Sequence, residues 1–127
     1  MKNNPEQRIA ELGLDLPTAP KPMGVYKPVL IVGNLLYVSG QGPLQSDGTL
    51  IKGRVGDDLS LEQGKHAARQ VGLAMLSTIK ANIGDLNNIK RLVKTLGMVN
   101  SSADFDMHPA VINGFSELIS EVFGEEN

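Results

Sequence analysis

The clearest pattern along the chain is a pair of apolar stretches separated by a turn signal. Residues 29–38 hold two runs of β-branched or apolar residues on either side of Gly33-Asn34. Gly-Asn supplies the positive φ angles of a tight turn, and its flanks have strand composition. The pattern therefore predicts a β-hairpin, whose second strand runs into Ser39 and must then leave the regular ladder.

Apolar residues at helical spacing predict three helices. The first begins at Asn4-Pro5, where Asn4 can cap and proline suits the first helical position. The second begins at a capping box, Ser60 to Gln63, and runs to about residue 82; the third runs from about residue 109 to 123. The buried stripes expected for the last two are Ala68, Val71, Met75, Ile79 and Val111, Phe115, Leu118, Val122. Gly64 and Gly72 are expected to pack closely on a sheet.

Two more strands are predicted, a short one over residues 49–51 and a long one over 89–99. Strands that precede helices in this order indicate an α+β fold with helices packed on one face of a mixed or antiparallel sheet. Residues 1–127 form a single domain in this interpretation. Within it, residues 1–23 hold the first helix and a proline-rich connector.

Composition narrows the function class. The formal charge of the 127 residues is −2, and no basic stripe follows the chain, so nucleic-acid binding is not expected. The absence of cysteine excludes disulfides and thiol nucleophiles. The N-terminus lacks the apolar core of a signal peptide and no apolar run approaches a membrane span, so we expect a cytoplasmic protein that does not contact a membrane.

Few residues carry an evident chemistry. His66 and His108 are the only histidines, and no carboxylate is spaced to complete a metal site with either; His108 remains a candidate general acid or base. Ser39 either satisfies local backbone groups or offers its hydroxyl to a ligand. Asn113, interpreted as lying on an apolar helix face, either clamps a loop or faces a pocket. The glycines at 40 and 42 do not open a helix, as a dinucleotide loop requires.

Taken together, several segments resemble the Rid family of reactive intermediate deaminases, also called YjgF-like or L-PSP endoribonuclease-like proteins. The resemblance covers about residues 24–124, and its most specific piece is the strand that ends in Ser-Gly-Gln, residues 32–41. The longer N-terminus looks like that of the subgroup with an N-terminal extension. The other matching segments are Gly24-Val25-Tyr26, Val93-Lys94-Thr95, Asp104-Phe105, Ile112-Asn113 and Val122-Phe123-Gly124.

The resemblance implies a chorismate-mutase-like fold and a homotrimer with pockets between subunits. Family members hydrolyse imines or enamines to ketoacids and ammonia, without a metal or a cofactor. Tyr26, Ser39 and Asn113 fall at the positions that bind the small imine or carboxylate ligand. Gly40, Gln41 and Ser116 are further pocket candidates, and Ser116 stands where typical members have a tyrosine.

The family's charged groups follow its Phe-Gly pair. An Ala-Arg-Ser segment supplies an arginine that holds the substrate carboxylate, and a later glutamate helps to position water. Neither falls within the 127 residues, so no catalytic residue is expected in this chain and two strands are expected after Asn127.

Two other functions stay open from the sequence. The first is a non-enzymatic trimeric protein that binds small carboxylates or regulates a partner enzyme, which the missing arginine favours for this chain. The second is an endoribonuclease or translation inhibitor, as one family name indicates. The net charge of −2 argues against that function, since phosphate contacts dominate RNA affinity.

Overall fold

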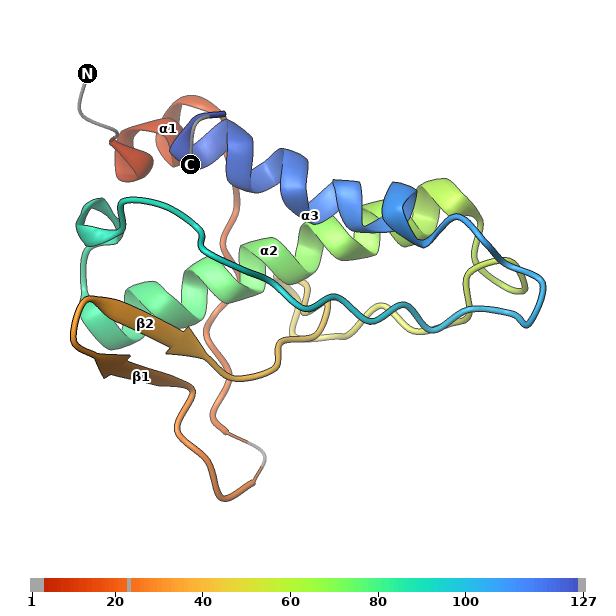
Figure 1. Ribbon diagram of the computed structural model, residues 1–127, viewed down its shortest axis with the longest axis horizontal. Coiled ribbons are helices and arrows are strands. Elements are labelled where there is room, and N and C mark those ends of the chain that lie inside the picture. The colour runs from red at the N-terminus through yellow and green to blue at the C-terminus, as the bar shows by residue number, and fades with distance from the viewer. Residues whose placement is uncertain (1–3, 23, 126–127) are drawn as a thin grey trace.

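The computed structural model describes residues 4–22 and 24–125 and shows the predicted α+β class. Helices α2 and α3 lie side by side and run in the same direction, and the hairpin lies beside the C-terminal half of α2 (Figure 1). No helix in the described ranges is long and apolar enough to cross a membrane. In chain order the elements are α1 (Pro5–Glu11), β1 (Val29–Val32), β2 (Leu35–Val38), α2 (Leu61–Ile83), the 3-10 turn η1 (Leu86–Asn88) and α3 (His108–Phe123).

The hairpin forms in the predicted register, with Val29 opposite Val38. Gly33 has a φ of 60°, whereas Asn34 has no positive φ, so only the first central residue uses the glycine conformation. That is the pattern of a type II′ turn, and the prediction of positive φ at both residues is wrong. The conformation still suits the twist of a two-residue hairpin, which explains why the register is unchanged.

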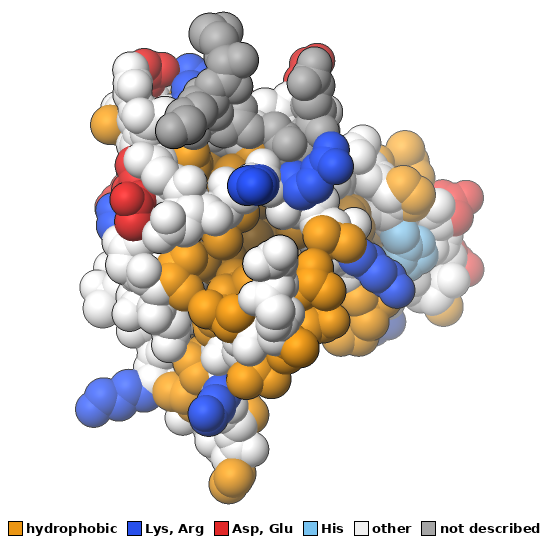
Figure 2. Space-filling model, turned by 60° about the vertical axis from the view of Figure 1, so that its left-hand side comes forward, with side chains coloured by type: hydrophobic (Ala, Val, Ile, Leu, Met, Phe, Trp, Pro, Cys, Tyr) orange, Lys and Arg blue, Asp and Glu red, His pale blue; other side chains and the backbone are white. Residues whose placement is uncertain are grey.

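One face of the hairpin packs on the core, and the other is open. Leu36 and Val38 lie against the core, while Leu30 and Tyr37 on the opposite face are 50% and 56% exposed. Figure 2 views this side of the molecule and shows hydrophobic side chains gathered around a hollow. The described residues therefore leave a considerable apolar area uncovered.

The helix ends follow the capping signals in the sequence. The Ser60 side chain accepts from the Gln63 backbone and the Gln63 side chain accepts from the Ser60 backbone, which completes the predicted capping box. Gly84, with a φ of 86°, ends α2, and Gly124 ends α3. The predicted stripe of α3 is buried throughout.

The core lies between α2 and α3, where glycines let the two helices approach. A Cβ built on Gly72 would lie 2.6 Å from Leu118 Cδ2, and one built on Gly114 would lie 2.0 Å from the Lys65 carbonyl oxygen. The prediction that the glycines of α2 pack on a sheet is wrong, because Gly72 packs on α3, and Gly64 on α3 and a loop. The sheet of the described residues holds β1 and β2 alone, so helix α3 provides the surface that these glycines approach.

The strands predicted over residues 49–51 and 89–99 do not form. Leu50 makes only an isolated bridge to Leu44. Residues 90–100 form an extended segment without helix or strand (Figure 1), in which Leu96 is 80% exposed. A strand needs a neighbour that pairs its backbone groups, and the described sheet holds β1 and β2 alone.

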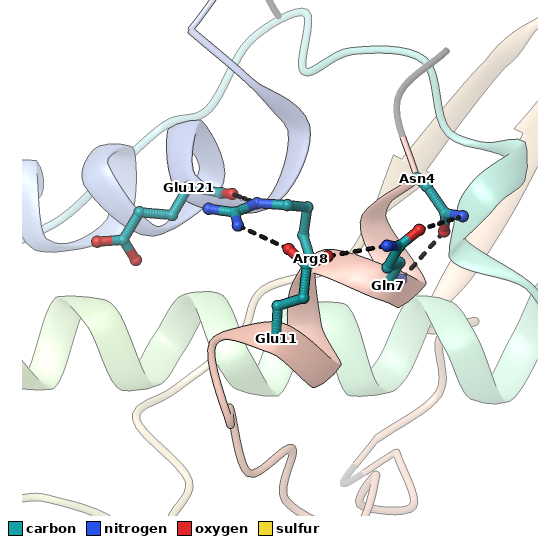
Figure 3. Close-up of polar contacts among 5 residues, drawn as sticks. All are labelled: Asn4, Gln7, Arg8, Glu11 and Glu121. Atoms are coloured by element: carbon teal, nitrogen blue, oxygen red, sulfur yellow. Dashed lines mark hydrogen bonds and ion pairs between the residues drawn. The ribbon is translucent and has the colours of Figure 1, made fainter. Parts of the chain in front are cut away.

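Helix α1 is capped by Asn4 and is attached to α3 by Arg8. Asn4 Oδ1 accepts from the Gln7 backbone N–H at 3.0 Å, as predicted. Arg8 donates through Nε to the Glu121 carbonyl of α3 at 3.1 Å and pairs with the Glu11 carboxylate at 2.9 Å (Figure 3). The N-terminal extension is therefore an integral part of the fold.

A second anchor of α1 joins it to α2 and η1. The Glu6 carboxylate lies 2.7 Å from Lys80 Nζ and accepts from the Leu86 backbone N–H at 3.0 Å. Ile9, the residue after Arg8, is buried in the core. Apolar and polar contacts together fix the helix.

Candidate functional site

Ser39 lies at the open end of the hairpin, directly after β2. Its backbone N–H donates to the Pro28 carbonyl at 3.0 Å, which extends the pairing by one residue. Its hydroxyl donates to the Lys27 carbonyl at 2.6 Å. The side chain is half-buried, so its oxygen is held in a fixed place near the surface.

The segment after Ser39 is attached to α2 through Gln41. The Gln41 amide nitrogen donates to the Ser39 carbonyl at 3.1 Å, and its amide oxygen accepts from the Thr78 hydroxyl at 3.1 Å. Thr78 is only 3% exposed. Gly40, between the two polar residues, has nothing within 4 Å of an added Cβ. The predicted pocket residues Ser39, Gly40 and Gln41 thus form one ordered surface.

Tyr26 lies at the same end of the hairpin. It belongs to the bend that precedes β1, two residues before Pro28, and it is 47% exposed. Lys27 follows it and is also exposed, so a cation lies beside the two predicted binding residues. The sequence analysis did not select Lys27, because a single loop lysine has no distinguishing pattern.

Asn113 and Ser116 lie elsewhere in the chain. Both are exposed on α3, and Gly114 between them packs on the Lys65 backbone of α2. Thr78, which holds the Ser39 segment, lies 13 residues after Lys65 on α2. At 1.5 Å per residue, the two positions are about 20 Å apart along the helix. One chain therefore brings Tyr26 and Ser39 together but does not bring Asn113 to them.

The prediction that Asn113 lies on the apolar face of its helix is wrong. It is two residues from Val111 and two from Phe115, both of which are buried. Two residues correspond to more than half a helical turn, so Asn113 points away from the stripe that they share. It has the exposure of a group that meets solvent or a second chain.

Two open hollows lie over the first turns of α2, away from Ser39. Their volumes are about 210 Å³ and 380 Å³. They share Glu62 and His66, and the smaller one reaches Gly114, next to Asn113. Neither hollow includes Tyr26 or Ser39, and the larger one is lined in part by apolar Ile51 and Leu59.

Acidic residues of α3 are paired across the helix interface. Lys65 Nζ lies 3.2 Å from the Glu117 carboxylate, and Arg69 lies 2.8 Å from that of Glu121. Glu117 and Glu121 each pair with a cation of α2 and not with each other, and their side chains are partly exposed. Each pair links α2 and α3 at their surface.

The histidines do not form a metal site. Residues 4–22 and 24–125 contain no group of three His, Cys, Asp or Glu side chains that could hold a metal ion. His66 is exposed on α2. His108 packs edge-on against Phe105 and its Nε2 lies 3.1 Å from the Ser101 hydroxyl.

Comparison with known proteins decides the family. Residues 6–127 match the family model described as "YjgF/chorismate mutase-like, putative endoribonuclease". The chain belongs to this family. The resemblance drawn from the Ser-Gly-Gln strand is thereby confirmed, and the fold agrees with it.

Individual relatives extend over most of the chain. Protein TCP17 of Trypanosoma cruzi is 41% identical over 118 residues, which are 93% of this chain and 74% of that protein. A RutC family protein of Sulfurisphaera tokodaii is 31% identical over 115 residues, 85% of this chain and 72% of its own. The crystal structure of "a putative endoribonuclease" from Shewanella oneidensis MR-1 matches with a TM-score of 0.91 and 35% identity, covering 97% of this chain and 82% of that one.

Proposed function

We propose that this YjgF-family protein is an imine or enamine deaminase of the Rid type. Its substrate is a small molecule with a carboxylate, and its products are ammonia and a 2-ketoacid. The observation that carries the proposal is the fixed Ser39 hydroxyl, held by Lys27 beside exposed Tyr26 at the end of the hairpin. Family membership supports the same chemistry.

The reaction is a hydrolysis that requires no redox change. An enamine first takes up a proton at carbon and releases one from nitrogen, which gives the imine. The oxygen of water bonds to the carbon of the C=N group, the π electrons move to nitrogen, and one water proton passes to that nitrogen. In the resulting carbinolamine the hydroxyl proton passes to nitrogen as the C=O bond forms and the C–N bond breaks, so nitrogen leaves as ammonia. The protein's part is to bind and orient the planar substrate, since positioning contributes much of catalysis.

The complete site is proposed to form between subunits of a homotrimer. Asn113 lies about 20 Å from the Ser39 segment along α2 within one chain, so a neighbouring subunit is needed to bring it near Tyr26. The exposed apolar face of the hairpin supports assembly, because larger uncovered apolar patches mark interaction surfaces. Closed ring symmetry would give three identical pockets.

The substrate carboxylate also needs a cationic partner. Arg8, Arg54 and Arg69 each contact an acidic or carbonyl group away from Ser39. Lys27 lies at the right end of the hairpin, but an ammonium does not reproduce the bidentate grip of a guanidinium. We propose that the main anchor lies on the segment that follows the Phe-Gly pair in the family.

Two other functions are distinguished by the same site. A non-enzymatic protein would bind a small carboxylate at Ser39 without releasing ammonia. An endoribonuclease, the activity named for the Shewanella relative, would cleave RNA and depend on basic groups. The net charge of −2 makes the deaminase the better supported proposal.

The test measures ammonia release from 2-aminoacrylate generated in situ. Ser39→Ala is expected to lower kcat/KM by about tenfold, the value of one hydrogen bond of moderate strength. Ser46→Ala, which removes a hydroxyl from an exposed turn, is the matched control and should keep the wild-type rate. Saturable binding of 2-ketobutyrate without turnover would instead indicate the binding protein, and RNA cleavage abolished with Ser39→Ala would indicate the nuclease.

A further inference from the structure

The amide of Gln41 can adopt only one orientation between its two partners. The Ser39 carbonyl has no proton to donate, so the amide nitrogen of Gln41 must face it. The amide oxygen then faces the Thr78 hydroxyl, which donates to it at 3.1 Å. The buried Thr78 hydroxyl of α2 thus supports the Gln41 amide in the one orientation that donates to the Ser39 backbone.

The proton of the Ser39 hydroxyl is also committed. Its partner at 2.6 Å is the Lys27 carbonyl, which can only accept, so the hydroxyl proton points toward the backbone. The Ser39 N–H is used as well, by the Pro28 carbonyl. What Ser39 presents to a ligand is therefore the lone pairs of its Oγ, and these accept hydrogen bonds.

We infer that Thr78 is a positioning residue which, through Gln41, holds Ser39 as a hydrogen-bond acceptor for the N–H of the ligand. The site selects a molecule whose reacting nitrogen carries a proton, such as an iminium or ammonium group, and Ser39 does not bind the carboxylate. This inference rests on the proposed function and names the part of the substrate that Ser39 recognises.

The chain offers a matched pair of residues on one helical turn. Thr78→Val preserves shape but removes the hydroxyl, which leaves the Gln41 amide oxygen without its donor. Thr78→Ser restores a hydroxyl. Ser77, the neighbouring residue, donates to the Pro17 carbonyl of the connector instead, so Ser77→Ala removes a comparably buried hydroxyl that does not contact Gln41.

The experiment uses NMR on the 127-residue chain with two ligands of nearly equal shape. The first, 2-aminoisobutyrate, carries an ammonium group where the second, pivalate, carries a methyl group; both carry a carboxylate. We expect 2-aminoisobutyrate to shift the Ser39 and Gly40 amide signals and to bind roughly tenfold more tightly, as a charge-assisted hydrogen bond provides. Thr78→Val should abolish that preference and move the side-chain amide signals of Gln41, whereas Thr78→Ser and Ser77→Ala should retain both.

Three results would overturn the inference. Equal affinity for the two ligands, or tighter binding of pivalate, would show that Ser39 does not accept from the ligand nitrogen. Unchanged Gln41 side-chain signals in Thr78→Val would show that Thr78 does not position the segment. Binding of neither ligand at millimolar concentration would refute the ligand assignment. The proposed deaminase activity is judged separately, by ammonia release: turnover with no ligand preference would refute the inference alone.

Discussion

The closest approach of α2 and α3 depends on one residue without a side chain. At Gly114 an added Cβ would lie 2.0 Å from the carbonyl oxygen of Lys65, a backbone atom that cannot rotate away. At Gly72 the nearest atom, 2.6 Å away, is the end of the Leu118 side chain, which can change rotamer. The two helix glycines are therefore not equivalent.

We expect Gly114→Ala to destabilise the protein by roughly 2–3 kcal/mol, the upper range for an overpacked core. Gly72→Ala should cost less, because the Leu118 side chain can move away from the added methyl group. Alanine also has a helix propensity about 1 kcal/mol better than glycine, which offsets part of the remaining cost. Urea unfolding followed by circular dichroism measures both free energies. Equal losses for the two variants would show that the Lys65 carbonyl is not the limiting contact.

The carboxyl group of Glu6 links stability to pH. Burial acts to raise the pKa of Glu6, but hydrogen bonds from Lys80 and from the Leu86 N–H, with the charge of Lys80, outweigh it and hold the pKa below its ordinary value of 4.5. A carboxyl with a lowered folded-state pKa adds stability above its unfolded pKa. That stability is lost as the pH falls through the folded value.

The pair can be measured with a double-mutant cycle of Glu6→Gln and Lys80→Met. At pH 7 we expect a coupling of about 0.5–1 kcal/mol, appropriate to a partly exposed pair. At pH 3, closer to the lowered folded-state pKa of Glu6, a larger share of the carboxyl groups carries a proton than at pH 7, so the coupling should be smaller. A coupling that stays constant between these pH values would mean that the charge of Glu6 does not contribute to the docking of α1.

At the scale of elements, short sequence signals correctly predicted the positions of the turns and helix ends, which depend only on interactions between neighbouring residues. The hairpin, the cap at Asn4, the capping box at Ser60 and the glycine at Gly84 each depend on a few adjacent residues, and all are found in the structure. The strand predicted over residues 89–99 depends on a distant partner for its backbone groups. Its apolar alternation alone does not reveal whether that partner is present.

The candidate site divides in the same way. Ser39 was recognised from its strand and the residues that follow it, and the structure shows its segment held in place. Asn113 was assigned to the wrong face of α3. Its neighbours in sequence are apolar, but the helical periodicity places its side chain on the exposed face, away from Val111 and Phe115. Thr78 was missed because buried threonine on an amphipathic helix has the pattern of a core residue, and its partner Gln41 lies 37 residues away.

The extended segment 90–100 should be dynamic in the 127-residue chain. Residues 92–98 of this segment lie in no strand of the described sheet, and Leu96 and Met98 are 80% and 88% exposed. Hydrogen exchange should therefore be fast over residues 92–98 and slow in the buried part of α2, since local opening ranges from near zero to the global free energy. Protection of this segment equal to that of α2 would show that another strand pairs with it.

At the scale of the whole molecule, the uncovered apolar surface favours assembly. Leu30, Val32, Leu35 and Tyr37, which share one face of the hairpin, are each 45–56% exposed. We predict a trimer in sedimentation velocity at micromolar concentration, because association would remove this area from water. A single monomeric species over that range would contradict the proposed subunit pockets.

A carboxylate anchor should raise the activity of the chain. The 127 residues place neutral donors and Lys27 near Ser39, but no arginine of the family motif. We expect the 127-residue chain to hydrolyse 2-aminoacrylate about ten- to a hundredfold more slowly than a version extended with the family's Ala-Arg-Ser segment. The same extension with that arginine replaced by methionine is the control. Equal rates for all three would refute the role assigned to the arginine.

The bond between Arg8 and the Glu121 carbonyl spans 113 residues, and this distance has a consequence for synthesis. A helix of seven residues such as α1 is marginal in water by itself, so it gains its stability from its contacts with α2, η1 and α3. At about 5–20 residues per second, roughly 6–23 s separate the translation of these two residues on the ribosome. The attachment of α1 to α3 can therefore form only after α3 has been synthesised, whereas its attachment to α2 and η1 can form earlier.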